Sequence, residues 1–252
     1  MERTALLGRL SWQLGEMVAT QAETARTKSI TLALPNWRGH RPGQHVDVRL
    51  TAEDGYQAER SYSIASPPEE DRRVTLTVER LDDGEVSPYL TGELRVGDKV
   101  ELRGPIGGYF VWEAHMGGPL LLVAGGSGTV PLVAMLRYPA AVGSTIATRL
   151  LSSSRSYENV IYCDELDRLE RSGTMLEVVQ TLTRAQPPGW TGYSRWIDTQ
   201  MLREVAWPSD QHPLMFICGP TPFVETAAAS LVTLGYEPAR IKTERFGPTG
   251  EA

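Results

Sequence analysis

Residues Arg60, Ser61, Tyr62 and Ser63 bring a cation, an aromatic ring and two hydroxyls into one short stretch. The stretch alternates with the period of two of a β-strand, which would place Arg60 and Tyr62 on one face, about 7 Å apart. A guanidinium fork suits a pyrophosphate, and a phenol ring suits a planar ring system. The stretch therefore predicts a site for a phosphorylated aromatic ligand. The alternative is an edge strand with an exposed arginine.

A glycine-rich turn directly follows the apolar run Pro119–Val123 and includes Gly126, Ser127 and Gly128. Glycines let a ligand approach the backbone, and the following helix offers free N–H groups and the positive end of its dipole. The spacing is not G-x-G-x-x-G, so a dinucleotide would lie differently from the usual Rossmann mode. The turn predicts phosphate binding, or else a connection that needs glycine for its geometry alone.

Further polar groups follow later strands, where open parallel sheets place their ligands. Cys218, Gly219 and Pro220 end one predicted strand, and the cysteine could face a reacting ring or be a small buried hydrophobe. Three arginines each follow a predicted strand: Arg155, Arg184 and Arg195. Together they suit a phosphate monoester, although each alone could be a solvated surface charge.

Short alternating segments separated by turns fill the first part of the chain. The predicted strands are Gln21–Leu34, Gln44–Leu50, the Arg60 stretch, Val74–Arg80, Val100–Arg103 and Tyr109–Trp112. A short helix is predicted at Ser87–Leu90, and the residues before Gln21 are left unassigned. Six short strands with little helix indicate a six-stranded antiparallel β-barrel, with a first domain at residues 1–115.

The pattern changes near residues 114–118, after which strands and helices alternate. The predicted strands are Pro119–Val123, Ile146–Leu151, Leu176–Thr183, Leu214–Cys218 and Ile241–Phe246. One predicted helix follows the glycine-rich turn and ends near Tyr138. Three others span Val160–Arg171, Gln200–Val205 and Pro222–Leu234. This alternation predicts an α/β domain with a parallel sheet at residues 116–252.

The composition of the 252 residues restricts the function further. A net charge of −6 argues against nucleic acid as a partner, and the apolar run at Pro119 is too short for membrane insertion. No secretory signal is evident, so a cytoplasmic protein is expected. Two cysteines, Cys163 and Cys218, are too few for an iron–sulfur cluster, and the four histidines lack metal-ligand spacing. No metal site is therefore expected.

As an ordered set, these motifs resemble the ferredoxin–NADP reductase superfamily, in the branch related to flavin modules of oxygenase reductases. The resemblance runs from about Ala25 to Phe246 and includes R-x-Y-S, Gly84–Ser87, Gly104–Phe110, the glycine turn, C-G-P and E-x-F. It implies a monomeric enzyme that takes hydride from NAD(P)H onto bound FAD and passes single electrons to a separate redox protein. That acceptor could be a ferredoxin, an oxygenase component, a cytochrome or another metal enzyme. FMN is the alternative flavin.

Two other functions stay open beside this one. The chain could be a flavin reductase that releases reduced flavin, or a non-catalytic flavin subunit that transfers electrons inside a larger complex. On the flavin side, the resemblance implies that Arg60 holds the phosphates, Tyr62 stacks on the isoalloxazine and Ser63 reaches its N5 region. The other implied flavin contacts are Ser61, Val86, Ser87, Gly107 and Phe110.

On the nucleotide side, the resemblance implies that Gly126, Ser127 and Gly128 hold the pyrophosphate. Thr183 and Arg184 would hold the 2′-phosphate of NADPH, with Arg155 and Arg195 at two further positions, so NADPH is expected over NADH. Cys218, Gly219 and Pro220 would lie beside the nicotinamide. Ser63, Cys218 and Glu244 are the expected catalytic residues. Phe246 would replace the family's terminal tyrosine, with the tail Gly247–Ala252 beyond it.

Overall fold

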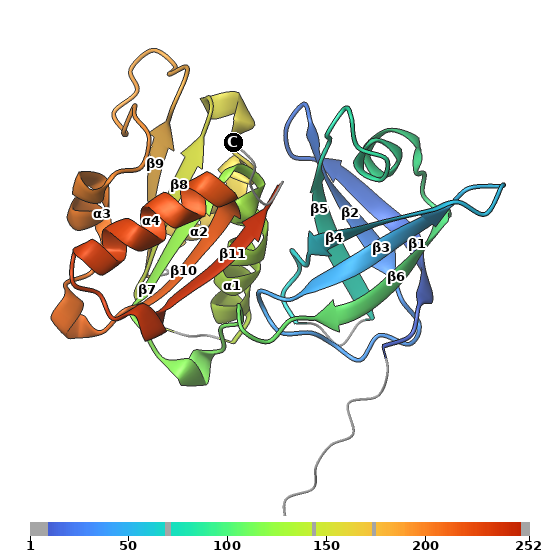
Figure 1. Ribbon diagram of the computed structural model, residues 1–252, viewed down its shortest axis with the longest axis horizontal. Helices are drawn as coiled ribbons and strands as arrows, with labels where there is room; N and C mark the ends of the chain where they lie inside the picture. Colours follow the sequence, from blue (N-terminus) through green and yellow to red (C-terminus); the bar gives the residue numbers. More distant parts are fainter. Residues whose placement is uncertain (1–9, 69–71, 143–144, 173–174, 248–252) are drawn as a thin grey trace, which may run out of the picture.

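The computed structural model describes residues 10–68, 72–142, 145–172 and 175–247. Two bodies lie side by side: a sheet of six strands from the first part of the chain, and a sheet of five strands flanked by helices from the second (Figure 1). Among the described helices, none has the length and apolar character needed to cross a membrane.

The first body is a closed antiparallel sheet. Its strands are β1 (Gln13–Ala22), β2 (Thr27–Ala33), β3 (His45–Thr51), β4 (Gln57–Ser63), β5 (Arg73–Glu79) and β6 (Lys99–Ile106). They pair in the order β4-β3-β6-β1-β2-β5, and a bridge between Ile64 and Leu76 joins the two end strands. Alternate side chains such as Val46 and Val48 fill the interior. The predicted six-stranded antiparallel barrel is confirmed.

Strand β1 occupies the stretch that the sequence left unassigned, and the predicted strand Gln21–Leu34 is in fact the end of β1, a turn and β2. The alternation of β1 is hard to see because Gly15 faces inward while Leu14 and Val18 are exposed on the outer face. Gly15 is close-packed, since a Cβ there would lie 2.7 Å from Leu102 Cδ1. A small residue inside and apolar residues outside reverse the usual signal for a half-buried strand.

The predicted strand Tyr109–Trp112 is also wrong, because this segment is irregular in the structure. Its apolar residues are buried for another reason: Phe110 and Trp112 pack into the core of the second body. The Phe110 ring meets that of Phe216 edge-on, with centroids 5.4 Å apart. The division predicted between residues 115 and 116 lies between β6 and the next strand, and as a domain boundary it stays a prediction.

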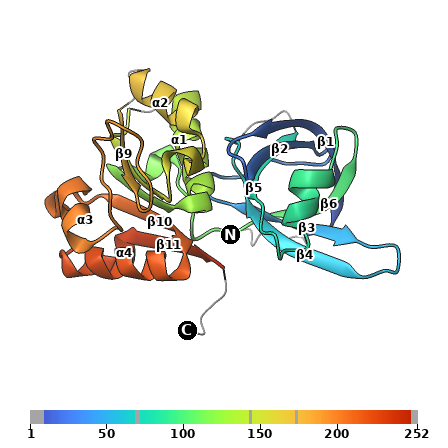
Figure 2. The ribbon, with the colours of Figure 1, turned by 90° about the horizontal axis from the view of Figure 1, so that it is seen from above.

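The second body is a parallel sheet of β7 (Leu120–Gly125), β8 (Thr148–Ser154), β9 (Leu176–Leu182), β10 (Leu214–Pro220) and β11 (Ile241–Phe246), in the order β11-β10-β7-β8-β9. Helices α1 (Thr129–Val142) and α2 (Cys163–Arg171) cover one face, and α3 (Thr199–Val205) and α4 (Thr221–Thr233) cover the other (Figure 2). The predicted α/β domain is confirmed. Successive strands are added on one side of β7 as far as β9 and then on its other side from β10, and sheets of this kind bind ligands at the point where the strand order reverses.

Burial explains the apolar run of β7. Leu120 and Leu122 pack in one core with α1, whereas Leu121 and Val123 pack in the other with α3 and α4. A strand covered on both faces needs apolar residues at every position. The remaining short elements are single turns: η1 (Tyr89–Glu93), η2 (Ala114–Met116), η3 (Gly126–Gly128), η4 (Tyr157–Asn159), η5 (Ser209–Gln211) and η6 (Pro238–Arg240).

Candidate functional site

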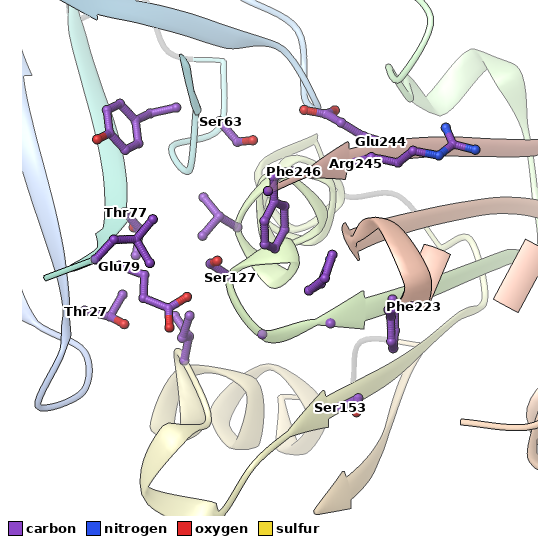
Figure 3. A pocket seen from close by; sticks show the side chains of 18 of the residues that line it. Thr27, Ser63, Thr77, Glu79, Ser127, Ser153, Phe223, Glu244, Arg245 and Phe246 are labelled. Carbon is purple, nitrogen blue, oxygen red and sulfur yellow. The ribbon is translucent and has the colours of Figure 1, made fainter. Parts of the chain in front are cut away.

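A cleft of about 1500 Å³ lies between the two bodies and is lined by residues of both. Strand β4 and the segments around Ser87 and Gly107 supply the barrel wall. The glycine turn after β7 and the ends of β8, β10 and β11 supply the other wall. Figure 3 shows Ser63 from the barrel and Ser127 and Phe246 from the sheet around the same space. The cleft therefore combines the two motifs that the sequence placed in separate domains.

Arg60, Tyr62 and Ser63 all line the cleft. The Arg60 side chain is 55% exposed, and its guanidinium lies 3.6 Å from the Glu85 carboxylate. Tyr62 is half-buried, and this burial raises the pKa of its hydroxyl to about 12, so the ring stays neutral. Ser61 also lines the cleft, but its hydroxyl donates to Asp47 Oδ1 at 2.7 Å. An exposed guanidinium and a half-buried aromatic ring thus stand on one wall.

The predicted contacts at Val86 and Ser87 line the cleft but cannot use their side chains freely. The Val86 side chain is fully buried in the barrel core. The Ser87 hydroxyl accepts a hydrogen bond from the Leu81 N–H at 3.0 Å and so holds the turn between them. Contacts from this segment to a phosphate would therefore come from backbone N–H groups.

Gly107 and Phe110 close the barrel wall. Gly107 has a φ of +99°, which favours glycine, and its carbonyl accepts a hydrogen bond from Gln44 Nε2 at 2.6 Å. Phe110 lines the cleft from a largely buried position against Phe216. The segment is held firmly at both ends, so it can present a fixed surface.

The three residues of the glycine turn have different environments. Gly126 has a φ of +56° and faces open space, since a Cβ there would meet nothing within 4 Å. Gly126 and Ser127 both line the cleft. Gly128 does not, because it packs so closely on β10 that a Cβ would overlap the Cys218 carbonyl. Two residues of the turn can hold a phosphate, and the third permits α1 to begin against β10.

Cys218 also lies below the cleft surface. It is 2% exposed, belongs to the core beneath α1 and does not line the cleft. Burial raises the pKa of its thiol well above the ordinary value, and the nearby Glu244 carboxylate adds to this. The thiol is therefore neutral and packs as a small hydrophobe. This placement matches the small buried hydrophobe that the sequence left open as an alternative, and it does not bring the sulfur to the lining of the cleft.

Phe223, which sequence reasoning missed, covers the surface above these residues. Its ring lies so close to Gly125 and Gly219 that a Cβ on either would come within 2.9 Å of it. Gly219 is covered in this way, whereas Pro220 and Phe223 line the cleft. Figure 3 shows the Phe223 ring there. The position of the aromatic residue, three beyond the C-G-P motif at the start of a helix, was the available signal.

Strand β11 brings Glu244 and Phe246 to the cleft (Figure 3). Burial raises the pKa of the Glu244 carboxyl to about 7. This group can therefore hold or release a proton near neutral pH. Phe246 is partly exposed at the cleft, and the tail positions 248–252 lie outside the described residues.

Two of the three arginines reach the cleft. Arg155 and Arg184 follow β8 and β9, line the cleft with Thr183, and are linked by a hydrogen bond from the Arg184 N–H to the Arg155 carbonyl at 2.9 Å. Both side chains are exposed, and neither forms an ion pair with a residue in the described segments. Two exposed guanidinium groups thus line the cleft beyond the ends of β8 and β9.

Arg195 is placed differently from the prediction. No described strand ends directly before it, because Arg195 lies in the long loop between β9 and α3. Its guanidinium pairs with Asp198 at 2.9 Å, lies near Glu204 at 4.0 Å and does not line the cleft. The neighbouring Trp196, which was missed, lines the cleft and is 66% exposed.

The donors and surfaces of the cleft fit a flavin dinucleotide and a pyridine nucleotide. One wall offers a guanidinium, a neutral tyrosine ring and backbone N–H groups, and the other offers an open glycine turn and two exposed arginines. Flat rings and several phosphates require this combination of apolar and cationic surfaces.

Comparison with known proteins agrees with this geometry. Residues 15–111 match the oxidoreductase FAD-binding domain, and residues 122–229 match the oxidoreductase NAD-binding domain. Ferredoxin–NADP reductase B of Sorangium cellulosum is 35% identical over 181 residues, which are 70% of this chain and 72% of that protein. The glycine betaine monooxygenase reductase subunit of Chromohalobacter salexigens is 29% identical over 211 residues, 83% of this chain but 56% of that protein.

The chain thus spans little more than half the length of the latter relative. Among solved structures, the flavohem-like FAD/NAD binding domain of nitric oxide dioxygenase from Vibrio cholerae superposes with a TM-score of 0.83 at 25% identity, covering 94% of this chain and 99% of that one. Both domain matches, the fold and the order of the motifs agree. The chain belongs to the ferredoxin–NADP reductase superfamily.

Proposed function

We propose that this chain is an FAD-containing NAD(P)H reductase of the ferredoxin–NADP reductase type, which passes electrons singly to a separate redox protein. The observation that carries the proposal is the shared cleft: Arg60 and Tyr62 line one wall, and Gly126 lines the other. FAD, when bound, supplies the conversion between two-electron and one-electron transfer. The protein's own residues bind and orient the two cofactors.

On the barrel side, Arg60 would bind the flavin pyrophosphate and Tyr62 would cover one face of its ring system. A charge-assisted hydrogen bond contributes about 1.5–3 kcal/mol, and the exposure of Arg60 favours the lower value. Backbone N–H groups near Ser87 would add neutral donors. Ser63 lines the same wall and would reach the reactive edge of the ring.

On the sheet side, Gly126 and Ser127 would hold the nucleotide pyrophosphate at the start of α1, where the helix N-terminus favours an anion. Phe223 and Pro220 form the apolar surface above the buried Cys218. Hydride transfer depends chiefly on placing two rings at near-contact distance. The apolar surface would keep water away from that contact, and Glu244 would hold a proton beside it.

Arg155, Thr183 and Arg184 would form the site for a 2′-phosphate and so favour NADPH over NADH. The support is that both guanidinium groups line the cleft while Arg195 is engaged by Asp198. Two contacts of about 1.5–3 kcal/mol each, reduced by solvent, correspond to at least tenfold discrimination. NADH as an equal substrate would contradict this part of the proposal.

The names of the relatives suggest the class of acceptor. One is a monooxygenase reductase subunit and another a ferredoxin–NADP reductase, so an oxygenase component or a ferredoxin is the proposed acceptor. A cytochrome or another metal enzyme would need the same access to the flavin edge. An acceptor panel of such purified proteins, scored by acceleration of NADPH oxidation, distinguishes them.

Three measurements on the purified chain test the proposal. Heat release and chromatography of the cofactor should yield FAD, whereas FMN alone would contradict the flavin assignment. NADPH oxidation with ferricyanide should be continuous, because the bound flavin turns over. Loss of flavin on desalting would instead support a flavin reductase that releases its product. Retained flavin without NADPH oxidation would support a non-catalytic subunit.

A further inference from the structure

Arg137 of α1 makes a contact that crosses between the two bodies. Its Nη1 donates to the Ala65 carbonyl at 2.6 Å, and Ala65 follows β4 in the barrel. Its Nε and Nη2 donate to the two carboxylate oxygens of Glu165 in α2, at 2.8 and 2.6 Å. The guanidinium also lies over the Tyr162 ring, 4.8 Å from the centroid. One side chain therefore joins two helices to a backbone carbonyl of the barrel.

Tyr162 makes a second crossing contact next to the first. Its hydroxyl donates to Thr77 Oγ1 of β5, which also bonds to Ser29 Oγ at 2.8 Å. The ring is almost fully buried. The Tyr162 backbone has φ 63° and ψ 29°, a left-handed conformation that is unfavourable for a tyrosine. Surrounding contacts must hold a residue in such a conformation, and here they lie at the domain boundary.

Both contacts lead to the walls of the cleft: the Tyr162 hydroxyl bonds to Thr77, which lines the cleft, and Arg137 bonds to the segment that follows Ser63. Ala65 stands two residues after Ser63, and its N–H donates to the Thr75 carbonyl at 2.8 Å. Arg137 lies two turns along α1, about 12 Å from Thr129, where the helix leaves the glycine turn. Helix α1 and the hydrogen-bonded backbone at Ala65 thus link the Arg137 contact to both walls, and closely packed elements transmit strain. A shift at Arg137 would therefore change the spacing between the walls.

We propose that Arg137 and Tyr162 are positioning residues that couple the two domains. They would fix the separation between the barrel wall of the cleft and the wall formed by the glycine turn and the ends of β8, β10 and β11. This inference rests on the proposed function. Neither residue lines the cleft, so neither would touch a cofactor bound there. Hydride transfer is sensitive to misplacement, and an error of about 1 Å can cost about 100-fold in rate. The coupling would therefore act on the rate of hydride transfer and leave nucleotide affinity unchanged.

The chain contains a matched control in Arg149 of β8. Its Nε donates to Glu177 at 2.6 Å, its Nη1 donates to the Val205 carbonyl at 3.0 Å, and its guanidinium lies 4.0 Å from the Trp207 ring centroid. The Arg149 side chain is 24% exposed, against 20% for Arg137. All its partners belong to the second domain. Arg149→Gln therefore removes the same kinds of contact without crossing the boundary.

The kinetic test measures single-turnover flavin reduction at saturating NADPH, together with the nucleotide Kd. Arg137→Gln and Tyr162→Phe should each lower the rate about tenfold or more with Kd changed by less than about twofold, while Arg149→Gln keeps the wild-type rate. Wild-type rates in both boundary variants overturn the positioning role. If Arg137→Gln does not fold, Tyr162→Phe, which removes one oxygen atom, decides the question.

A second readout does not depend on turnover. Hydrogen–deuterium exchange of the full chain as purified should rise at residues 63–66 and 75–78 in Arg137→Gln and Tyr162→Phe, and stay at the wild-type level there in Arg149→Gln. Unchanged exchange in the boundary variants overturns the coupling. If the wild-type chain fails to oxidise NADPH, the proposed function and the positioning role both fail, and the exchange comparison alone decides whether these residues couple the domains.

Discussion

Replacing Glu244 by glutamine should stabilise the flavin-free chain at alkaline pH. Glu244 lies on β11 at the cleft, and burial raises the pKa of its carboxyl from an ordinary 4.5 to about 7. Burial disfavours the charged form because the carboxylate loses its water without gaining a cation. Glutamine has nearly the same shape and carries no charge at any pH. The variant therefore isolates the cost of the charge from the cost of the packing.

The sign follows from proton binding. Between pH 4.5 and about 7 the native carboxyl keeps its proton while the unfolded one has lost it, so the free energy of unfolding falls as pH rises through this window. A pKa difference of this size corresponds to about 3 kcal/mol above pH 7. The stability of Glu244→Gln minus that of the wild type should therefore increase by about 3 kcal/mol between pH 4 and pH 8.

Urea unfolding of the flavin-free chain across this pH range measures the difference. Glu225→Gln is the control, because Glu225 is mostly exposed and pairs with Arg245 at 2.6 Å on the same side of the protein. Its difference from wild type should stay nearly constant, within about 1 kcal/mol. The explanation is wrong if Glu244→Gln shows the same pH profile as wild type, because the buried carboxyl would then titrate as it does in the unfolded chain.

Three further substitutions test the site. Arg60→Ala should weaken flavin retention by about 1.5 kcal/mol, or roughly tenfold in Kd by fluorescence titration, and unchanged binding would exclude a phosphate contact. Arg184→Ala should lower kcat/KM for NADPH about tenfold with little effect on NADH, and equal losses for both would exclude a 2′-phosphate contact. Gly128→Ala should reduce the free energy of unfolding by more than about 3 kcal/mol, because the new Cβ would overlap the Cys218 carbonyl. Gly126→Ala should reduce it by only about 1–2 kcal/mol, the cost of the left-handed backbone conformation at that position. Thermal unfolding compares the two variants, and equal losses would contradict the packing described for Gly128.

Much of the fold could be predicted because the pattern of apolar residues in most strands matches the number of their faces that are buried. Strand β7 is apolar at every position since helices cover both faces, and β3 alternates since the barrel covers one. Strand β1 could not be found in this way, because its inward Gly15 and outward Leu14 invert the pattern. Phe110 and Trp112 gave a false strand signal because their burial comes from the neighbouring domain.

The cleft was predictable where a side chain's direction follows from its place in a strand. Arg60 and Tyr62 lie on such a strand, and Arg155 and Arg184 stand one and two residues beyond the ends of β8 and β9. Arg195 could not be placed because it lies in a loop, whose course depends on tertiary contacts such as the pairing with Asp198. Outside helices and strands, the pattern of residue types does not predict where a side chain points.

At the carboxyl end of β10 the residue types could be read from the sequence, but the depth at which each side chain is buried could not. Gly128 packs on the Cys218 carbonyl, Phe223 packs on Gly219, and the Cys218 side chain points into the core. Each of these residues is small or apolar because its neighbour packs directly against it, and together they form the surface beneath this end of the cleft. The same residue types would also suit direct contact with a nicotinamide. Only the packing distinguishes a residue that lines the cleft from one that supports its surface from below, and the packing places the Cys218 thiol below that surface.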